Sequence, residues 1–243
     1  MKNLSKARSF IFYLVAATIT IVIGVVCLPA FFFAKLNIKV ARCWIKIILA
    51  LLKVICKINF KIIGKENIRG GAFVVISKHQ SALETLVFPL IILHPIFILK
   101  KSILFIPVMG LALKSARAIY IDRSKGRDSI LQMKKQLQEL SKKDAPVIFP
   151  EGTRTEAGKR TEKYHSGAAM IYEALQWPVV PVAVNTGMFW PKSGKMKSGT
   201  ATIKILPPIF PPKKYDRKQF LKQINEVIES NSIELYKNTL SKS

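Results

Sequence analysis

The chain has 243 residues, half of them hydrophobic, with 39 Lys and Arg against 14 Asp and Glu. This length suits one sizeable α/β domain plus an appendage, and the hydrophobic content excludes a mainly disordered chain. The formal net charge of +25 predicts a polyanionic partner: nucleic acid, an anionic membrane surface or a phosphorylated substrate.

The placement of the charge distinguishes these partners. Residues 1–65 contain no acid, since Glu66 is the first, and the same stretch is the most hydrophobic part of the chain. Basic and apolar residues together favour anionic lipid over DNA. The sequence has no zinc-finger spacing and no basic-aromatic RNA motif, so we do not expect a nucleic-acid partner.

Residues 9–34 form a run without charged side chains. A helix of about 20 residues crosses the hydrocarbon core of a bilayer, so this run is long enough to span it. Pro29 interrupts the run near its end, and a helix that dips into the bilayer and returns is an alternative. Basic residues flank the run on both sides, so the positive-inside rule gives no orientation.

Residues 38–58 predict a second helix of a different kind. Lys39, Lys46 and Lys53 recur every seven residues and therefore share one side, while apolar residues form a broad second face. This pattern favours a helix lying in the headgroup plane; the alternative is a helix that faces a protein core. We expect residues 1–60 to be a two-helix membrane anchor and residues 61–243 to be the globular domain.

The globular part alternates strands with helices. Strands are predicted at 72–77, 96–99, 118–121, 146–149, 179–184 and 200–206, and helices at about 80–93, 125–143, 167–175 and 216–237. This alternation predicts an α/β fold with a mainly parallel sheet flanked by helices. Pro181 lies inside one predicted strand and suggests an edge strand or a bulge.

The segment 77–84 (SKHQSALE) is the sharpest local feature. His79 follows a predicted strand, and Glu84 lies in the first turn of the next helix. Open α/β sheets place their sites at this end of the strands. Glu84 could accept one ring N–H of His79 and leave the other nitrogen as a general base. Alternatively, Ser81-x-x-Glu84 is a capping box, and spacing alone leaves both readings open.

The segment 149–155 (FPEGTRT) predicts a turn after another strand. Gly152 allows backbone N–H groups to approach an anion, and Arg154 offers a forked contact to phosphate. A simple turn with an exposed arginine is the alternative. The sequence has neither a Gly-x-Ser-x-Gly elbow nor a histidine cluster with metal-ligand spacing, so we expect neither a serine hydrolase nor a zinc enzyme.

The order of four segments is more specific than any one of them. The series His79-x4-Glu84, 120–123 (YIDR), 149–154 (FPEGTR) and 179–182 (VVPV) resembles the signature of the glycerophospholipid acyltransferases. Within that family it is most similar to the bacterial enzymes that act on 1-acyl-sn-glycerol 3-phosphate. Residues 100–107 (KKSILFIP) are similar to the stretch between the first two motifs. The resemblance covers roughly residues 60–210.

The resemblance implies a reaction. His79 would deprotonate the free hydroxyl of the lysophospholipid, whose oxygen attacks the thioester of acyl-CoA or acyl-carrier protein and gives phosphatidic acid. Glu84 would orient His79, and no covalent acyl-enzyme, metal or organic cofactor is implied. The residues expected to bind substrate are Glu151, Gly152, Thr153, Arg154, Arg123, Lys100 and Lys101.

Two positions depart from the family pattern. Glu84 stands where the family usually has Asp, although the longer side chain can still reach the ring of His79. His165 stands where relatives often have Lys, which bears on the choice of headgroup. Other acceptors, such as glycerol 3-phosphate or a lyso-aminolipid, are the alternative. A non-catalytic basic membrane-binding protein would leave the four ordered motifs unexplained.

The implied setting is a membrane surface. A lysophospholipid keeps its acyl chain in the bilayer while its headgroup reaches the enzyme. The basic N-terminal part would bind anionic lipid and attract CoA or an acidic carrier protein. We expect a bacterial inner-membrane location, with the catalytic domain on the cytoplasmic side.

Overall fold

The computed structural model describes residues 2–68, 70–106, 108–122, 126–210 and 216–241. Seven strands form one sheet in the order β1-β7-β6-β2-β5-β3-β4. Neighbouring strands are parallel except β6 and β7, so the mainly parallel α/β sheet predicted from the sequence is confirmed. The strands are β1 (Ile58–Ile63), β2 (Val74–Ser77), β3 (Pro95–Lys100), β4 (Ile119–Ile121), β5 (Ala145–Ile148), β6 (Val179–Val184) and β7 (Gly199–Ile205).

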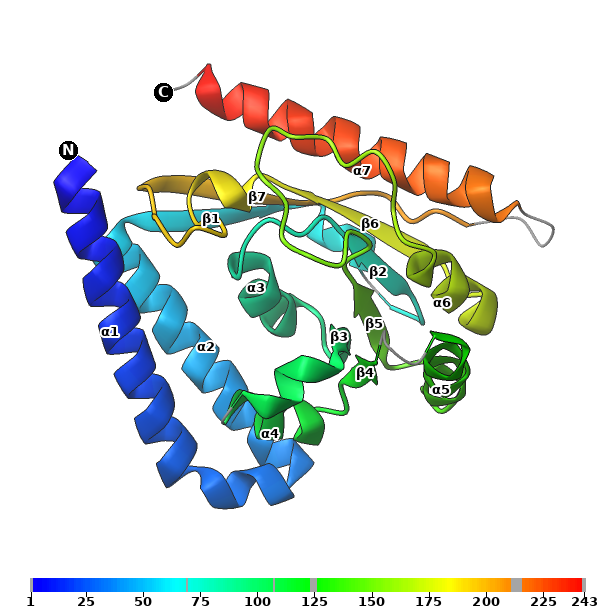
Figure 1. The fold of residues 1–243 in the computed structure, drawn as a ribbon, viewed down its shortest axis with the longest axis horizontal. Helices are drawn as coiled ribbons and strands as arrows, with labels where there is room; N and C mark the ends of the chain where they lie inside the picture. The colour runs from blue at the N-terminus through cyan, green and yellow to red at the C-terminus, as the bar shows by residue number, and fades with distance from the viewer. Residues whose placement is uncertain (1, 69, 107, 123–125, 211–215, 242–243) are drawn as a thin grey trace.

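Helices cover both faces of this sheet (Figure 1). The α-helices are α1 (Lys2–Val26), α2 (Ala34–Cys56), α3 (Leu83–Ile91), α4 (Met109–Ser115), α5 (Gly126–Gln138), α6 (Gly167–Leu175) and α7 (Arg217–Leu240). Short 3-10 turns lie at Leu28–Phe32, Lys65–Ile68, Lys101–Phe105 and Thr186–Met188.

Alternate side chains of strand β2 face opposite sides of the sheet and so belong to two different apolar clusters. Val75 packs with α2 and α3 in one apolar cluster, whereas Val74 and Ile76 pack with α5, α6 and α7 in the other. Because both faces of β2 are covered, the strand is fully buried, and its residues are apolar except for Ser77 at its end. The segment that follows β2 is therefore held from both sides of the sheet.

The second helix belongs to the folded core. Ile48 and Leu52 of α2 are buried in the cluster that contains Val75, while Lys39, Lys46 and Lys53 are exposed. The core-facing alternative is thus correct for the apolar side of this helix. The boundary expected after residue 60 falls inside β1, which pairs with β7 along its whole length.

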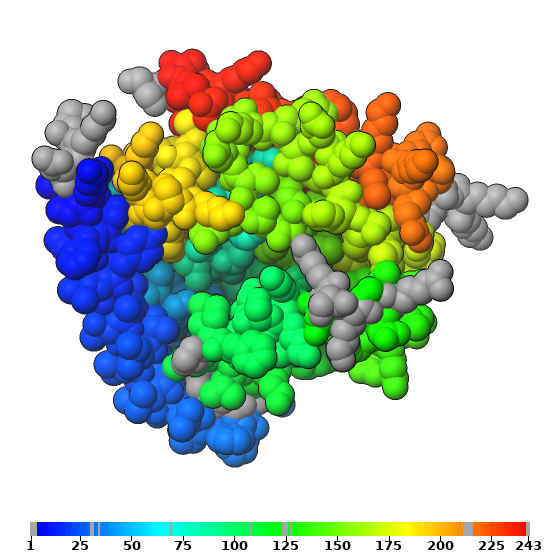
Figure 2. Space-filling view, viewed as in Figure 1, coloured from blue at the N-terminus to red at the C-terminus, as the bar shows by residue number. Residues whose placement is uncertain are grey.

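The first helix is different, because most of its apolar surface is uncovered. Phe10, Ile21 and Val25 are 60–69% exposed. Helix α1 packs beside α2 and forms one edge of the molecule (Figure 2). Phe12 attaches α1 to the sheet domain by an edge-to-face contact with Trp190. Among the described residues, one helix, Leu4–Val26, is long and apolar enough to cross a membrane.

The position of Pro181 corrects one expectation. Strand β6 lies inside the sheet between β7 and β2, so it is not an edge strand. Regular pairing with β7 begins only at Val182 and Ile205, and Leu206 donates its backbone N–H to the carbonyl of Pro181. The chain after β7 pairs again at Ile209 with Val179, so residues 207 and 208 lie opposite residue 180 alone, which is the predicted bulge. Pro181 is tolerated there because its missing N–H falls where the regular pairing with β7 has ended.

Candidate active site

His79 follows the central strand β2, as the sequence predicted. Its neighbours in the sheet are β5 and β6, whose carboxyl ends meet at the same edge. The ring of His79 stacks on Phe149, just after β5, with centroids 4.2 Å apart and planes 24° apart. His79 is 19% exposed at its side chain, so its ring is mostly packed but still accessible.

The carboxylate of Glu84 contacts the His79 ring at Nδ1. Its Oε1 lies 3.0 Å from His79 Nδ1, and its side chain is 0% exposed. Oε1 also accepts the backbone N–H groups of Gln80 and Ser81, and Oε2 accepts the hydroxyl of Thr186 at 2.7 Å. Because a carboxylate only accepts, we assign the proton of the neutral imidazole to Nδ1, which leaves Nε2 as the basic nitrogen.

The dyad occurs together with one half of the predicted capping box, the bond from Ser81 N to the Glu84 carboxylate, while the N-cap residue of α3 is Ala82. Glu84 Oε1 accepts from Ser81 N at 2.8 Å, and Ser81 Oγ accepts from Leu83 N at the start of α3. The N-terminus of a helix also favours a negative charge. The two readings of the sequence were therefore not exclusive: the cap fixes the carboxylate that in turn orients His79.

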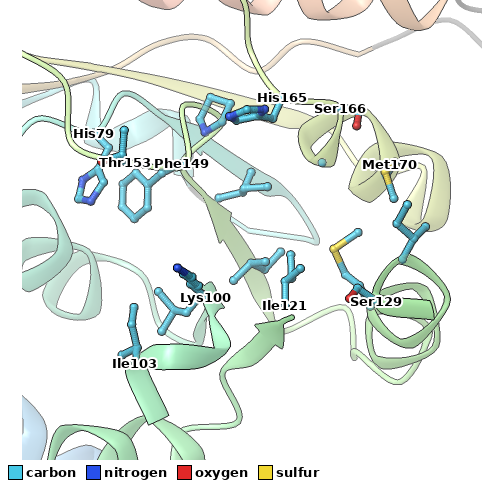
Figure 3. Close-up of a pocket in the computed structure, with 18 residues that line it drawn as sticks. His79, Lys100, Ile103, Ile121, Ser129, Phe149, Thr153, His165, Ser166 and Met170 are labelled. Atoms are coloured by element: carbon cyan, nitrogen blue, oxygen red, sulfur yellow. The ribbon is translucent and has the colours of Figure 1, made fainter. Parts of the chain in front are cut away.

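A cavity of about 380 Å³ opens beside His79. Its wall is mostly apolar and comes from the sheet and from α5 and α6 (Figure 3). The apolar wall includes Ile98, Ile121, Met133, Ile148 and Met170. Lys100, Thr153 and His165 contribute polar groups to the same lining. The cavity thus combines a base, an apolar interior and hydrogen-bond donors.

The glycine turn lies next to the base. Gly152 has φ of +68°, a left-handed conformation that glycine adopts without strain, and its N–H bonds to the carbonyl of Phe149. Gly152 and Thr153 line the cavity. The hydroxyl of Thr153 accepts from Lys192 Nζ at 3.2 Å, which adds a cation that the sequence reasoning missed. Arg154 is half-buried and lies outside the cavity lining.

The other residues that were expected to bind substrate lie in different places. Lys100 lines the cavity, whereas Lys101 is exposed and pairs with Asp122 at 3.4 Å. Arg123 lies outside the described residues. Within the ranges given above, no group of three or more His, Cys, Asp or Glu side chains could hold a metal ion.

Glu151 points inward instead of lining the cavity. Its Oε2 accepts the backbone N–H of His79 at 2.8 Å, and its Oε1 lies 3.1 Å from Lys78 Nζ. The side chain is 1% exposed. Burial raises the pKa of Glu151 to about 7, although Lys78 opposes the rise. This geometry assigns Glu151 to the support of His79 and not to direct substrate contact.

Lys78 and Glu229 complete this buried network. Lys78 Nζ lies 2.8 Å from Glu229 Oε1, and Glu229 belongs to the C-terminal helix α7. Sequence reasoning gave neither residue a role. Lys78 immediately precedes His79, so an internal lysine beside a predicted base was a usable signal. Nothing local indicated Glu229, which is 151 residues away.

The fold and the site define an α/β protein with a mostly buried His–Glu pair beside a mostly apolar cavity, which is the arrangement of an enzyme site. Comparison with known proteins agrees with this class. The acyltransferase family model matches residues 59–185, and the chain belongs to this family.

Curated relatives span different shares of the chain. The 1-acyl-sn-glycerol-3-phosphate acyltransferase of Pseudomonas aeruginosa is 35% identical over 216 residues, which cover 85% of this chain and 82% of the relative. The Saccharomyces cerevisiae enzyme of the same name is 31% identical over 176 residues, covering 70% of this chain and 56% of the relative.

A solved structure has the same fold. The crystal structure of the 1-acyl-sn-glycerophosphate acyltransferase of Thermotoga maritima aligns with a TM-score of 0.78 and covers 96% of this chain and 98% of its own. Its sequence is 21% identical, so the match carries the fold alone.

Proposed function

We propose that this acyltransferase transfers an acyl chain to the free hydroxyl of 1-acyl-sn-glycerol 3-phosphate and so forms phosphatidic acid. The observation that carries the proposal is the His79–Glu84 dyad at an apolar cavity whose lining also contains Lys100 and the Gly152 turn. The relatives from Pseudomonas and Saccharomyces are 1-acyl-sn-glycerol-3-phosphate acyltransferases, which supports the same acceptor.

His79 acts as the general base. Nε2 accepts the proton of the acceptor hydroxyl as its oxygen bonds to the thioester carbonyl carbon, and the C–S bond then breaks. The imidazolium returns the proton to the departing thiolate, so the enzyme ends unchanged. Glu84 stabilises the imidazolium through the bond at Nδ1, as the buried carboxylate does in a serine-protease triad.

The cavity supplies a place for an acyl chain. Its apolar wall continues from His79 between the sheet and α5 and α6, where Met133 and Met170 lie. Burial of methylene groups there contributes about 0.8 kcal/mol each. The flexible methionine side chains can adjust to the shape of a chain. Either acyl-CoA or acyl-carrier protein serves as the donor in this proposal.

Cations near the base suit the phosphate of the acceptor. Lys100 lines the cavity, and Lys192 donates to Thr153 on the glycine turn. Arg154 follows this turn, and the phosphate contacts expected of Arg154 and Arg123 stay predictions. Lys101 contributes charge to the surface and not a direct contact, since it already pairs with Asp122.

Helix α1 and the exposed lysines of α2 suit a membrane surface. Apolar side chains such as Phe10, Ile21 and Val25 would enter the lipid, and Lys39, Lys46 and Lys53 would attract anionic headgroups. Each Lys or Arg near an anionic surface contributes about 1 kcal/mol. We place the enzyme at the bacterial inner membrane with its catalytic domain in the cytoplasm.

An acceptor panel tests the proposed reaction. The purified chain is given lysophosphatidate, glycerol 3-phosphate or a lyso-aminolipid, each with acyl-CoA and with acyl-carrier protein. We expect lysophosphatidate to be acylated fastest. Acylation of another acceptor but not of lysophosphatidate would overturn the assignment.

A histidine variant tests the base. His79→Ala should lower kcat by at least about 10³-fold, since it removes a general base and its charge. Binding to anionic vesicles should persist. The matched control is His94→Ala, because His94 lies outside the cavity lining and precedes β3. Turnover by His79→Ala at the rate of the control would refute the mechanism.

A further inference from the structure

A lysine directly before the catalytic base is buried inside the protein. The side chain of Lys78 is 1% exposed, and its Nζ lies 2.8 Å from both carboxylate oxygens of Glu229 and 3.1 Å from Glu151 Oε1. The side chain of Glu229 is 0% exposed. One ammonium and two carboxyl groups thus share a site from which water is excluded.

These groups join the C-terminal helix to the backbone of His79. Glu229 on α7 contacts Lys78, Lys78 contacts Glu151, and Glu151 Oε2 accepts the N–H of His79 at 2.8 Å. The carbonyl of His79 is held as well, because Thr155 N donates to it at 2.8 Å. Both backbone polar groups of the base are therefore fixed by the turn that follows β5.

Glu229 is itself held in place by two further donors. The hydroxyl of Tyr164 donates to Oε1 at 2.8 Å, and Thr161 N donates to Oε2 at 3.1 Å. Asn225, one turn earlier on α7, donates to the carbonyl of Thr161 at 2.8 Å. The loop 149–165 is thus fastened to α7 at its far end and to His79 at its near end.

Stability alone is a weak reason for such a network. Removing three ionisable groups from water carries a large desolvation cost, and apolar side chains of similar size are often as stabilising. Burial accordingly raises the pKa of Glu151. The network also acts on the one residue whose position the chemistry requires to be accurate within a fraction of an ångström.

We propose that Lys78, Glu151 and Glu229 form a buried bracket that positions His79 for proton transfer, so that helix α7 supports catalysis from outside the cavity. These are positioning residues, since they act through the backbone of His79 and do not line the cavity. Glu84 orients the ring, and the bracket fixes the backbone that carries it. The inference rests on His79 being the base of the proposed reaction.

Glu229→Gln is the principal test. In this variant the amide oxygen can still accept from Thr161 N, and the amide N–H can donate to the hydroxyl oxygen of Tyr164, but the charge that Lys78 faces is lost. We expect kcat to fall about 10- to 100-fold, with KM for both substrates within twofold of wild type. The rates are divided by the concentration of folded protein, which circular dichroism measures. A site that is only displaced loses rate without losing substrate binding.

The matched control lies on the same helix. Glu226 is one turn before Glu229, exposed, and paired with Arg160. Glu226→Gln makes the same chemical change without reaching the bracket, and its kcat should stay within twofold of wild type. Equal kcat for folded Glu229→Gln and Glu226→Gln would overturn the proposal.

A double-mutant cycle separates positioning from general damage. Lys78→Met and Glu229→Gln break the same connection, so the double variant should lose about as much kcat as the worse single variant. If the kcat losses of the two single variants multiplied in the double variant, the two residues would act independently, which would contradict the bracket. If Glu229→Gln does not fold, Tyr164→Phe decides, with kcat expected 3- to 10-fold lower and an unchanged kcat refuting the idea.

Failure of the bracket and failure of the proposed function are distinguishable. If wild-type protein acylates no acceptor, or His79→Ala retains the wild-type rate, the proposed function fails before the bracket is tested. If His79→Ala is inactive while folded Glu229→Gln is fully active, the base is correct and the bracket is wrong.

Discussion

Glu84→Gln is the substitution that best separates the two tasks of this carboxylate. An amide oxygen at the position of Oε1 could still accept from Gln80, Ser81 and the ring of His79. The amide nitrogen would then face Thr186, whose hydroxyl can turn and accept. The start of α3 would keep its cap, and the negative charge alone would be lost.

The expected loss follows from the geometry. At 3.0 Å and an effective dielectric constant of about 20, an imidazolium and a carboxylate attract by about 5 kcal/mol. A neutral hydrogen bond to the amide would retain about 1 kcal/mol of this, and the exposed part of His79 reduces the difference further. A barrier increase of about 3–4 kcal/mol corresponds to a kcat about 10²- to 10³-fold lower.

Initial-rate acylation of lysophosphatidate measures this effect. Glu66→Gln is a matched control, because Glu66 is exposed and lies outside the cavity lining. Glu84→Asp keeps the charge and should retain at least about a tenth of the wild-type kcat. If Glu84→Gln turned over within threefold of wild type, the carboxylate would cap the helix and its charge would play no part in catalysis.

Three further predictions concern stability, chain length and membrane binding. Folded Glu151 holds a proton up to about pH 7 that the unfolded chain releases near pH 4.5. Its contribution to the free energy of unfolding should therefore fall by about 3 kcal/mol between pH 4.5 and 7. Urea unfolding of Glu151→Gln should lack this fall, and parallel curves would contradict it. Met133→Trp fills the cavity beyond His79 and should shift the preferred donor toward shorter acyl chains, with an unchanged profile in a chain-length series refuting the cavity assignment. Ile21→Gln combined with Val25→Gln should reduce sedimentation with phosphatidylglycerol vesicles several-fold at unchanged kcat on detergent-dispersed substrate, and undiminished sedimentation would exclude α1 as the lipid contact.

Much of the candidate active site could be predicted from the sequence because its contacts are local. His79 and Glu84 are five residues apart in a strand–turn–helix unit, so a buried strand followed by a capped helix brings the ring and the carboxylate together. The mainly parallel sheet followed from the alternation of strands and helices for the same reason. The period of two and the helical period are properties of neighbouring residues.

The partners of these elements were decided only by the tertiary structure. The sequence pattern of α2 allowed its apolar face to meet lipid or protein, and the sheet determined that Ile48 and Leu52 are buried. Pro181 suggested an edge strand or a bulge, and the tertiary structure shows a bulge inside the sheet. Each outcome depends on which elements become neighbours, and residue spacing does not contain that information.

Glu151 and Glu229 show the same limit at the site. The motif around Glu151 indicated a substrate contact, whereas packing turns this side chain inward to Lys78 and the backbone of His79. Glu229 reaches Lys78 across 151 residues, through the docking of α7 on β6. The sequence by itself determined that the ring of His79 and the carboxylate of Glu84 lie together after β2. The surroundings that hold them required the folded chain, because buried ion pairs form between surfaces that only long-range packing brings together.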